Sequence, residues 1–238
     1  MISRALTVTF LAFLGAAPDA LAGPAGPVAR TTAEWTNKDE TALLHHRITL
    51  PPLSVWDAPK QEWRGALPNE GPSTTPKIRI VHMWGTWCIP CKEEFPVIKQ
   101  MDMQIRTDYH GDVQFVYVAD TLSSTSEMKD FMAQRHATMP LGLIYHDDEN
   151  KLGADLLSAL PQKGAIAGRT ESVSERQLML PLTLLVDQNN VVRQAFVGSL
   201  LPRRADLVNG IAQLHKALTQ GISPSKQKVA AKKGRTQL

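Results

Sequence analysis

The fold is decided by one stretch near the middle of the chain, Trp84-Gly85-Thr86-Trp87-Cys88-Ile89-Pro90-Cys91-Lys92. A short apolar run at residues 78–83 comes just before it and predicts a buried strand. Residues 88 to about 107 then have the character of a helix, so Cys88 lies at or near its N-terminus. Cys88 and Cys91 are the chain's only two cysteines, and one helical turn brings their sulfurs together.

This placement gives the two cysteines different chemistry. Backbone N–H groups and the positive end of the helix stabilise a thiolate at Cys88, so we expect Cys88 to attack a substrate disulfide. Cys91 lies a turn deeper, is more shielded and resolves the mixed disulfide. Two alternatives are half of a zinc site, whose second cysteine pair is missing, and a structural disulfide, whose short loop would add little stability.

The motif W-x-x-W-C-x-x-C after an apolar strand resembles the active site of the thioredoxin superfamily. Pro96 matches the proline that kinks the active-site helix of that family, and Cys91-Lys92-Glu93-Glu94-Phe95-Pro96 is similar to the C-x-x-E-x-P continuation of its TlpA- and ResA-like branch. The resemblance covers residues 78–220. It implies an α/β, thioredoxin-like fold with a mixed central sheet and helices on both faces. It also implies an exported thiol-disulfide oxidoreductase, a class often involved in cytochrome c maturation.

A second segment extends the resemblance, Leu180-Pro181-Leu182-Thr183-Leu184-Leu185-Val186-Asp187. In the family the corresponding proline is cis and begins a strand, so Pro181 is expected to be cis and to face the cysteine pair. Its role would be to present the backbone of Leu180 to an extended substrate, as in strand addition. The alternative is an ordinary trans proline that starts a strand.

Two ionisable residues near the motif complete the candidate site. His82 stands close to where thioredoxins carry a buried aspartate, and it could accept the proton of Cys91 during resolution. Its alternative is a core histidine bonded to backbone. Glu94, about one turn after Cys91, is implied by the family match to tune thiol acidity; its alternative is a solvated carboxylate on the helix surface.

Along the rest of the chain, predicted strands and predicted helices mostly alternate. Ser124 and Glu127 form a capping box that opens a helix to about residue 136. A turn at Asp187-Gln188-Asn189-Asn190 predicts a hairpin near the end. The remaining predicted strands are residues 48–55, 62–67, 113–119, 141–145, 182–186 and 191–197, and the remaining helices are residues 151–160 and 203–220.

The two ends of the chain carry different signals. Residues 1–22 predict an export signal cleaved after Ala22, because an apolar run too short for a membrane span ends in Ala20-Leu21-Ala22; an uncleaved anchor is the alternative. We expect a flexible segment at 23–33, the thioredoxin-like domain at 34–221 with an insertion at 162–177, and a basic disordered tail at 222–238. The tail holds five Lys and Arg residues and no acid, so it carries +5 of a net charge of +3 and the rest of the chain sums to −2. The basic balance is therefore no sign of nucleic-acid binding by the folded part.

These observations predict a periplasmic enzyme that uses the Cys88–Cys91 dithiol to reduce specific protein disulfides, with no other cofactor. Family and compartment imply a membrane thiol carrier as its electron donor. Three alternatives remain: an oxidase of exported dithiols, a copper chaperone that uses Cys88, Cys91 and His82, and an exported structural domain with an inert disulfide. The hydrophobic content of 43% excludes a disordered chain.

Overall fold

A computed structural model describes residues 37–50, 54–65, 76–120, 122–135, 144–146, 151–160 and 178–222 of the chain. They belong to the second of two compact units, Thr32–Leu238. Four predicted features lie outside the described residues: the export signal, the segment at 23–33, the insertion at 162–177 and the tail beyond Ile222. Within the described part, none of the helices has the length and apolar character that crossing a bilayer requires.

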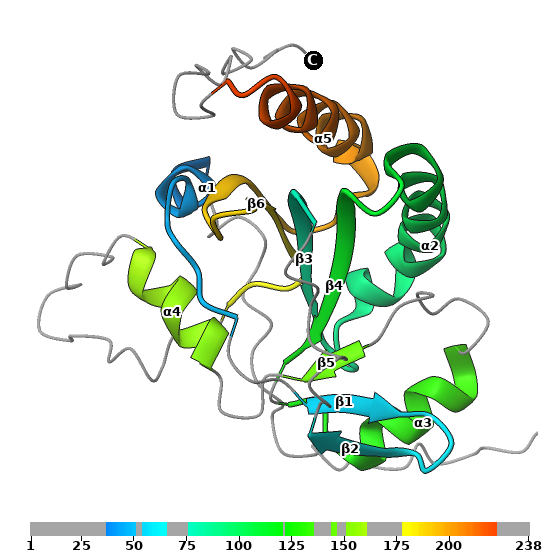
Figure 1. The fold of residues 1–238 in the computed structure, drawn as a ribbon. Helices are drawn as coiled ribbons and strands as arrows, with labels where there is room; N and C mark the ends of the chain where they lie inside the picture. The colour runs from blue at the N-terminus through cyan, green and yellow to red at the C-terminus, as the bar shows by residue number, and fades with distance from the viewer. Residues whose placement is uncertain are drawn as a thin grey trace, which may run out of the picture. The chain divides into compact units, whose positions relative to one another are not determined.

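The described residues form a mixed sheet of seven strands in the order β2-β1-β5-β4-β3-β6-β7 (Figure 1). Three central strands run parallel, and both edges of the sheet are antiparallel hairpins. The parallel strands are β3 (Ile78–Trp84), β4 (Val113–Ala119) and β5 (Ile144–His146). The hairpins are β1 (Ser54–Asp57) with β2 (Glu62–Gly65), and β6 (Leu182–Asp187) with β7 (Val192–Val197).

Helices cover both faces of this sheet, as predicted (Figure 1). The side chains of β3 alternate between the two faces because successive residues of a strand point to opposite sides. Val81 and Met83 join the apolar cluster with α1 and α4, whereas Ile80 packs with α2 and α5 on the other face. These helices are α1 (Asn37–Leu43), α4 (Lys151–Ala159), α2 (Ile89–Tyr109) and α5 (Arg204–Thr219).

The strand directions bring three connections to the same end of the central strands. The parallel strands β3 and β4 end together, since Trp84 pairs with Ala119. The antiparallel strand β6 begins at this same end, since its Leu182 pairs with Met83. The loop that leads into α2, the loop that follows β4 and the segment at Pro181 therefore lie side by side.

The capping box predicted from the sequence is present at α3 (Thr125–Arg135). The Ser124 N–H donates to Glu127 Oε2 over 2.9 Å, and the Glu127 N–H donates back to Ser124 Oγ over 3.4 Å. Two N–H groups at the start of the helix thus gain partners, which is how this pattern stabilises a helix N-terminus. The packed face of α3 places Met128 and Phe131 against the start of α2.

The structure corrects the prediction near the N-terminus. The expected strand at residues 48–55 begins only at Ser54, and Ile48 instead donates its N–H to the Asn190 carbonyl of the hairpin turn. The sequence also did not predict α1, which has seven residues. A helix this short depends on tertiary contacts, here the burial of Leu43 and a bond from the Val197 N–H to Glu40 Oε1.

Candidate active site

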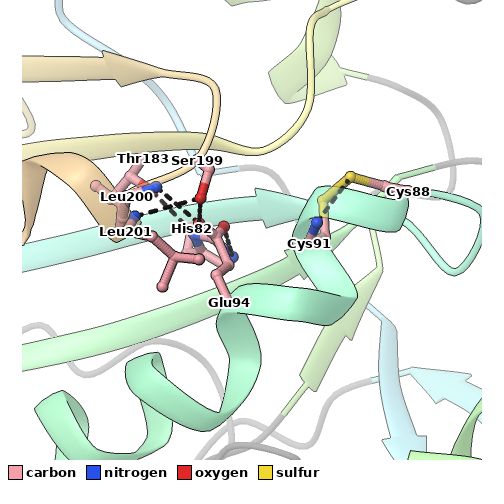
Figure 2. Close-up of polar contacts among 8 residues, drawn as sticks. All are labelled: His82, Cys88, Cys91, Glu94, Thr183, Ser199, Leu200 and Leu201. Atoms are coloured by element: carbon pink, nitrogen blue, oxygen red, sulfur yellow. Dashed lines mark hydrogen bonds and ion pairs between the residues drawn. A yellow bond between two sulfur atoms is a disulfide. The ribbon is translucent and has the colours of Figure 1, made fainter.

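The two cysteines form a disulfide at the first turn of α2 (Figure 2). Cys88 is the N-cap residue, and the Cys91 N–H donates to Cys88 Sγ over 3.3 Å. Cys88 is 3% exposed and Cys91 is fully buried, so both cysteines are buried in the disulfide form. A backbone N–H and the positive helix end both act on Cys88 Sγ, an arrangement that stabilises a thiolate once the disulfide is reduced.

The loop before the disulfide is held by the loop after β4. Trp87 Nε1 donates to Asp120 Oδ2 and Ser123 Oγ donates to Asp120 Oδ1, each over 2.9 Å, while the Thr86 N–H donates to Ser123 Oγ over 3.1 Å. Gly85 leaves room for these contacts, because a Cβ there would lie 2.8 Å from Trp87 Nε1 and 3.0 Å from Asp120 Oδ1. Burial raises the pKa of Asp120, and the bonds from Ser123 and Trp87 oppose that shift.

The surroundings of the disulfide are apolar on both its outer and its inner side. Outside, the residues on either side of Cys88 in the sequence, Trp87 and Ile89, are 46% and 67% exposed, so large apolar side chains flank the nearly buried Cys88. Inside, both cysteines belong to one apolar cluster. Its other buried members among the described residues are Trp56, Trp84, Phe95, Ala119, Met128, Phe131 and Ile144.

The peptide bond between Leu180 and Pro181 is cis, as predicted. Pro181 is buried, and its carbonyl accepts the Gly198 N–H over 2.9 Å. Leu180 is half-buried and packs against the cluster that contains both cysteines. The segment predicted to meet a substrate therefore adjoins the disulfide.

His82 is fully buried on β3, beneath α2. Its Nδ1 lies 2.9 Å from Thr183 Oγ1 on β6, so its partner is a side chain and not the backbone of the alternative interpretation. Its Nε2 faces Glu94 Oε1 at 3.6 Å, beyond hydrogen-bonding distance (Figure 2). Burial lowers the pKa of His82 to about 3, so the imidazole is neutral at physiological pH.

Glu94 is also fully buried, so the alternative of a solvated surface carboxylate is wrong. Its Oε2 accepts the Leu200 N–H over 2.7 Å and the Ser199 hydroxyl over 3.0 Å. Burial raises the pKa of Glu94 to about 7, and these two hydrogen bonds oppose the rise. Glu94 therefore changes charge near neutral pH, one helical turn from Cys91.

The structure thus brings all five predicted residues to one end of the sheet. Cys88, Cys91 and Pro181 lie just beyond the ends of the central strands, and His82 and Glu94 face each other nearby. Sequence reasoning missed Asp120, although its place directly after a parallel strand next to β3 is a recognisable signal. It also missed Thr183 and Ser199, whose hydroxyls carry no distinctive pattern in the sequence.

The predicted copper alternative would need His82 together with both cysteines. Both sulfurs are joined in the disulfide, and the two ring nitrogens of His82 face Thr183 and Glu94. Over the described part of the chain, no group of three or more His, Cys, Asp or Glu side chains is arranged to hold a metal ion.

No family model matches the chain, but individual proteins are similar to it in sequence. The thiol:disulfide interchange protein DsbE of Escherichia coli is 26% identical over 165 residues, which cover 69% of this chain and 70% of DsbE. DsbE of Shigella flexneri matches over the same length with the same identity.

Solved structures give the fold. The solution structure of a candidate protein disulfide isomerase from Bacteroides thetaiotaomicron is 14% identical, covers 75% of this chain and 94% of its own length, and has a TM-score of 0.50. A candidate DsbE from Chlorobium tepidum is 19% identical over 72% of this chain and 98% of its own, with a TM-score of 0.48. The chain therefore has a thioredoxin-like fold, and its sequence is similar to that of thiol:disulfide interchange proteins.

Proposed function

We propose that the chain is an exported thiol-disulfide oxidoreductase that reduces the disulfides of specific proteins. The observation that carries the proposal is the Cys88–Cys91 disulfide at the N-terminus of α2. Redox cysteines act in such an environment because the helix end favours the thiolate, which is the nucleophile in disulfide exchange. A purely structural role is disfavoured, since a bridge between residues i and i+3 constrains the unfolded chain very little.

The proposed cycle begins with the reduced dithiol. The Cys88 thiolate attacks one sulfur of the substrate disulfide; a Cys88–substrate bond forms, and the other substrate sulfur leaves and is protonated. Cys91 then gives up its proton and attacks Cys88 Sγ, which releases the second substrate thiol. The substrate disulfide gains two electrons, and the enzyme's dithiol becomes the Cys88–Cys91 disulfide. A membrane thiol carrier, oxidised from dithiol to disulfide in turn, restores the reduced enzyme.

Substrate docking is proposed to involve the exposed apolar side chains around Cys88. Because Cys88 is almost covered, a substrate must present its sulfur from a segment that contacts Trp87 and Ile89. A protein segment that carries apolar residues beside its cysteine suits this border better than a small polar thiol. Leu180 provides a backbone beside the cysteines for strand addition.

The proposed periplasmic location rests on the export signal predicted at residues 1–22. The proposed role in cytochrome c maturation rests on the family resemblance.

A trapping experiment tests this function. The Cys91→Ser variant, mixed with a disulfide-bonded protein such as insulin, should accumulate a mixed disulfide at Cys88 that mass spectrometry detects. The Cys88→Ser variant is the matched control and should form none. Reduced wild type should release insulin thiols, and both variants should lose catalytic turnover. Turnover by Cys88→Ser would overturn the proposal.

A further inference from the structure

A single carboxylate of α1 binds both ends of the segment that joins β7 to α5, residues 197–203. Glu40 Oε1 accepts the Val197 N–H over 2.9 Å at the start of this segment. The same oxygen accepts a hydrogen bond from the Arg203 guanidinium at its end. Because two donors from opposite ends of the segment share one acceptor, Glu40 fixes the distance between those ends.

Between its ends, the segment 197–203 contacts two parts of the redox site. The Gly198 N–H donates to the carbonyl of Pro181 over 2.9 Å, next to the cis peptide bond. The Ser199 hydroxyl and the Leu200 N–H donate to Glu94 Oε2 over 3.0 Å and 2.7 Å (Figure 2). The position of the segment therefore decides how well these donors reach Pro181 and Glu94.

The segment has little regular structure of its own to hold the donors in place. Gly198 has a φ of +85°, in the left-handed region that glycine enters and leaves at low cost. The 3-10 turn η4 (Leu201–Arg203) is only three residues long. A turn this short depends on contacts made elsewhere. Burial of Leu200 in the apolar cluster with α5 fixes the middle of the segment, and Glu40 fixes its ends.

α1 is anchored to the core, so its carboxylate can act as a fixed point. Leu43 is fully buried in the apolar cluster that also contains Val192 and Ala195 of β7. The side chains of Glu40 and Arg203 are 18% and 35% exposed, so water screens their interaction less than it screens a pair on the open surface. Hydrogen bonds to an ionised acceptor are also roughly twice as strong as neutral ones.

We propose that Glu40 is a positioning residue of the redox site and acts on Glu94 through the segment 197–203. By holding both ends of the segment, Glu40 keeps the Ser199 hydroxyl and the Leu200 N–H within hydrogen-bonding distance of Glu94. The proposal rests on the proposed function and adds to it a residue that is far from the cysteine motif in the sequence.

The segment acts on the charge of Glu94. Burial raises the pKa of Glu94 to about 7, and the bonds from Ser199 and Leu200 oppose that rise because they favour the carboxylate. When these bonds are weakened, the pKa of Glu94 moves further up and less carboxylate remains at neutral pH. His82 of β3 faces the other oxygen at 3.6 Å and stays neutral in this range, because burial lowers its pKa to about 3.

Carbon-13 magnetic resonance of the Glu94 carboxyl in the oxidised chain measures this effect without relying on activity. The signal is identified by its loss in Glu94→Gln, and in wild type it should titrate near pH 7. Glu40→Ala should move the midpoint upward by roughly one pH unit, the effect of weakening a hydrogen bond to a charged group. Ser199→Ala, which removes one donor directly, should move the midpoint in the same direction.

Further variants separate the geometry of Glu40 from its charge. Glu40→Asp keeps the charge but is one methylene too short to reach both donors, so it should shift the midpoint as Glu40→Ala does. Glu40→Gln is the milder change and should give a smaller shift, because its amide oxygen can still accept the Val197 N–H. Asp206→Asn is the matched control and should titrate as wild type does. It removes the other carboxylate near Arg203, 3.9 Å from Nε, and leaves both bonds of Glu40 in place.

A Glu94 midpoint at the wild-type value in the folded Glu40 variants would overturn the proposal. The reduction potential links the effect to the proposed function. A less ionised Glu94 repels the thiolate of the reduced pair less, so Glu40→Ala should have a higher potential against glutathione at neutral pH than wild type or Asp206→Asn. An equal potential in all three would overturn the role of Glu40 in the redox site. Failure of reduced wild type to release insulin thiols would instead refute the proposed function, and the Glu94 titration would still decide what Glu40 does.

Discussion

Glu94 and His82 lie together in the core, and their pKa values are shifted in opposite directions. Burial disfavours the charged form of each side chain, and it therefore raises the pKa of the acid and lowers that of the base. At neutral pH the imidazole is uncharged and Glu94 is about half ionised, so the contact does not act as a buried ion pair between two charged groups. The site therefore contains a buried carboxyl that titrates near neutral pH one helical turn from Cys91.

Replacing Glu94 by Gln should change how stability depends on pH. The pKa of Glu94 is about 7 in the folded chain against an ordinary value of 4.5, so its contribution is fully present below pH 4.5 and is lost as the pH rises to about 7. Glu94→Gln should therefore gain stability relative to wild type across this window, by about 3 kcal/mol in total. Denaturant unfolding measures the difference, and a difference independent of pH would contradict this assignment.

His82→Asn should show the opposite trend. The pKa of His82 is about 3 in the folded chain against 6.5 ordinarily, so its contribution is fully present above pH 6.5 and is lost as the pH falls. Relative to wild type, the variant should gain about 1.4 kcal/mol per pH unit of acidification below about pH 6.5. The same unfolding series tests this, and a constant difference between the variant and wild type would rule it out.

Among the elements, the two loops that follow β3 and β4 hold one another. Trp87 and Ser123 both donate to the Asp120 carboxylate, one oxygen each. This arrangement fixes the indole of Trp87 beside Cys88, although the ring itself is nearly half exposed. The border that we propose for substrate docking is therefore positioned by the loop after β4.

Asp120→Asn should destabilise the chain by about 1–3 kcal/mol, because an amide cannot accept from both donors and leaves one of them unsatisfied. In a Trp87→Phe background the same substitution should cost less, since one donor is already gone. A double-mutant cycle of unfolding free energies measures this coupling. Strictly additive costs would show that the Asp120–Trp87 bond does not hold the loop.

Much of the element order from residue 78 onward could be predicted, because short apolar runs, the capping box and the hairpin turn act locally. The disulfide and the cis Leu180–Pro181 bond were likewise predicted from local motifs and their resemblance to a family. The His82–Glu94 contact could not be predicted in this way, since it depends on how α2 packs across β3. α1 was missed for the same physical reason: its seven residues owe their helix to distant contacts.

At the scale of the whole molecule, the redox state of the disulfide is linked to folding. The bridge closes so short a loop that it contributes little through chain entropy, and any difference in stability between the oxidised and reduced chains reflects the reduction potential. A strong oxidant is more stable when reduced. For a reductase we expect the reverse.

The oxidised chain should therefore unfold at a higher denaturant concentration than the reduced chain, with about 1.4 kcal/mol for each 30 mV by which folding lowers the potential. Parallel unfolding curves with and without a thiol reductant measure this difference. A variant with both Cys88 and Cys91 replaced by Ser is the control and should unfold identically in the two conditions. Greater stability of the reduced wild type would indicate an oxidase.

The most direct test of the central claim is the equilibrium of the chain with a glutathione redox series, followed through the oxidation of Cys88 and Cys91. We predict one two-electron transition with a potential well below about −200 mV, in the range of a disulfide reductant. A potential near about −120 mV would make the chain a disulfide donor and contradict the proposed direction. A cysteine pair that does not exchange with glutathione at all would contradict the redox function itself.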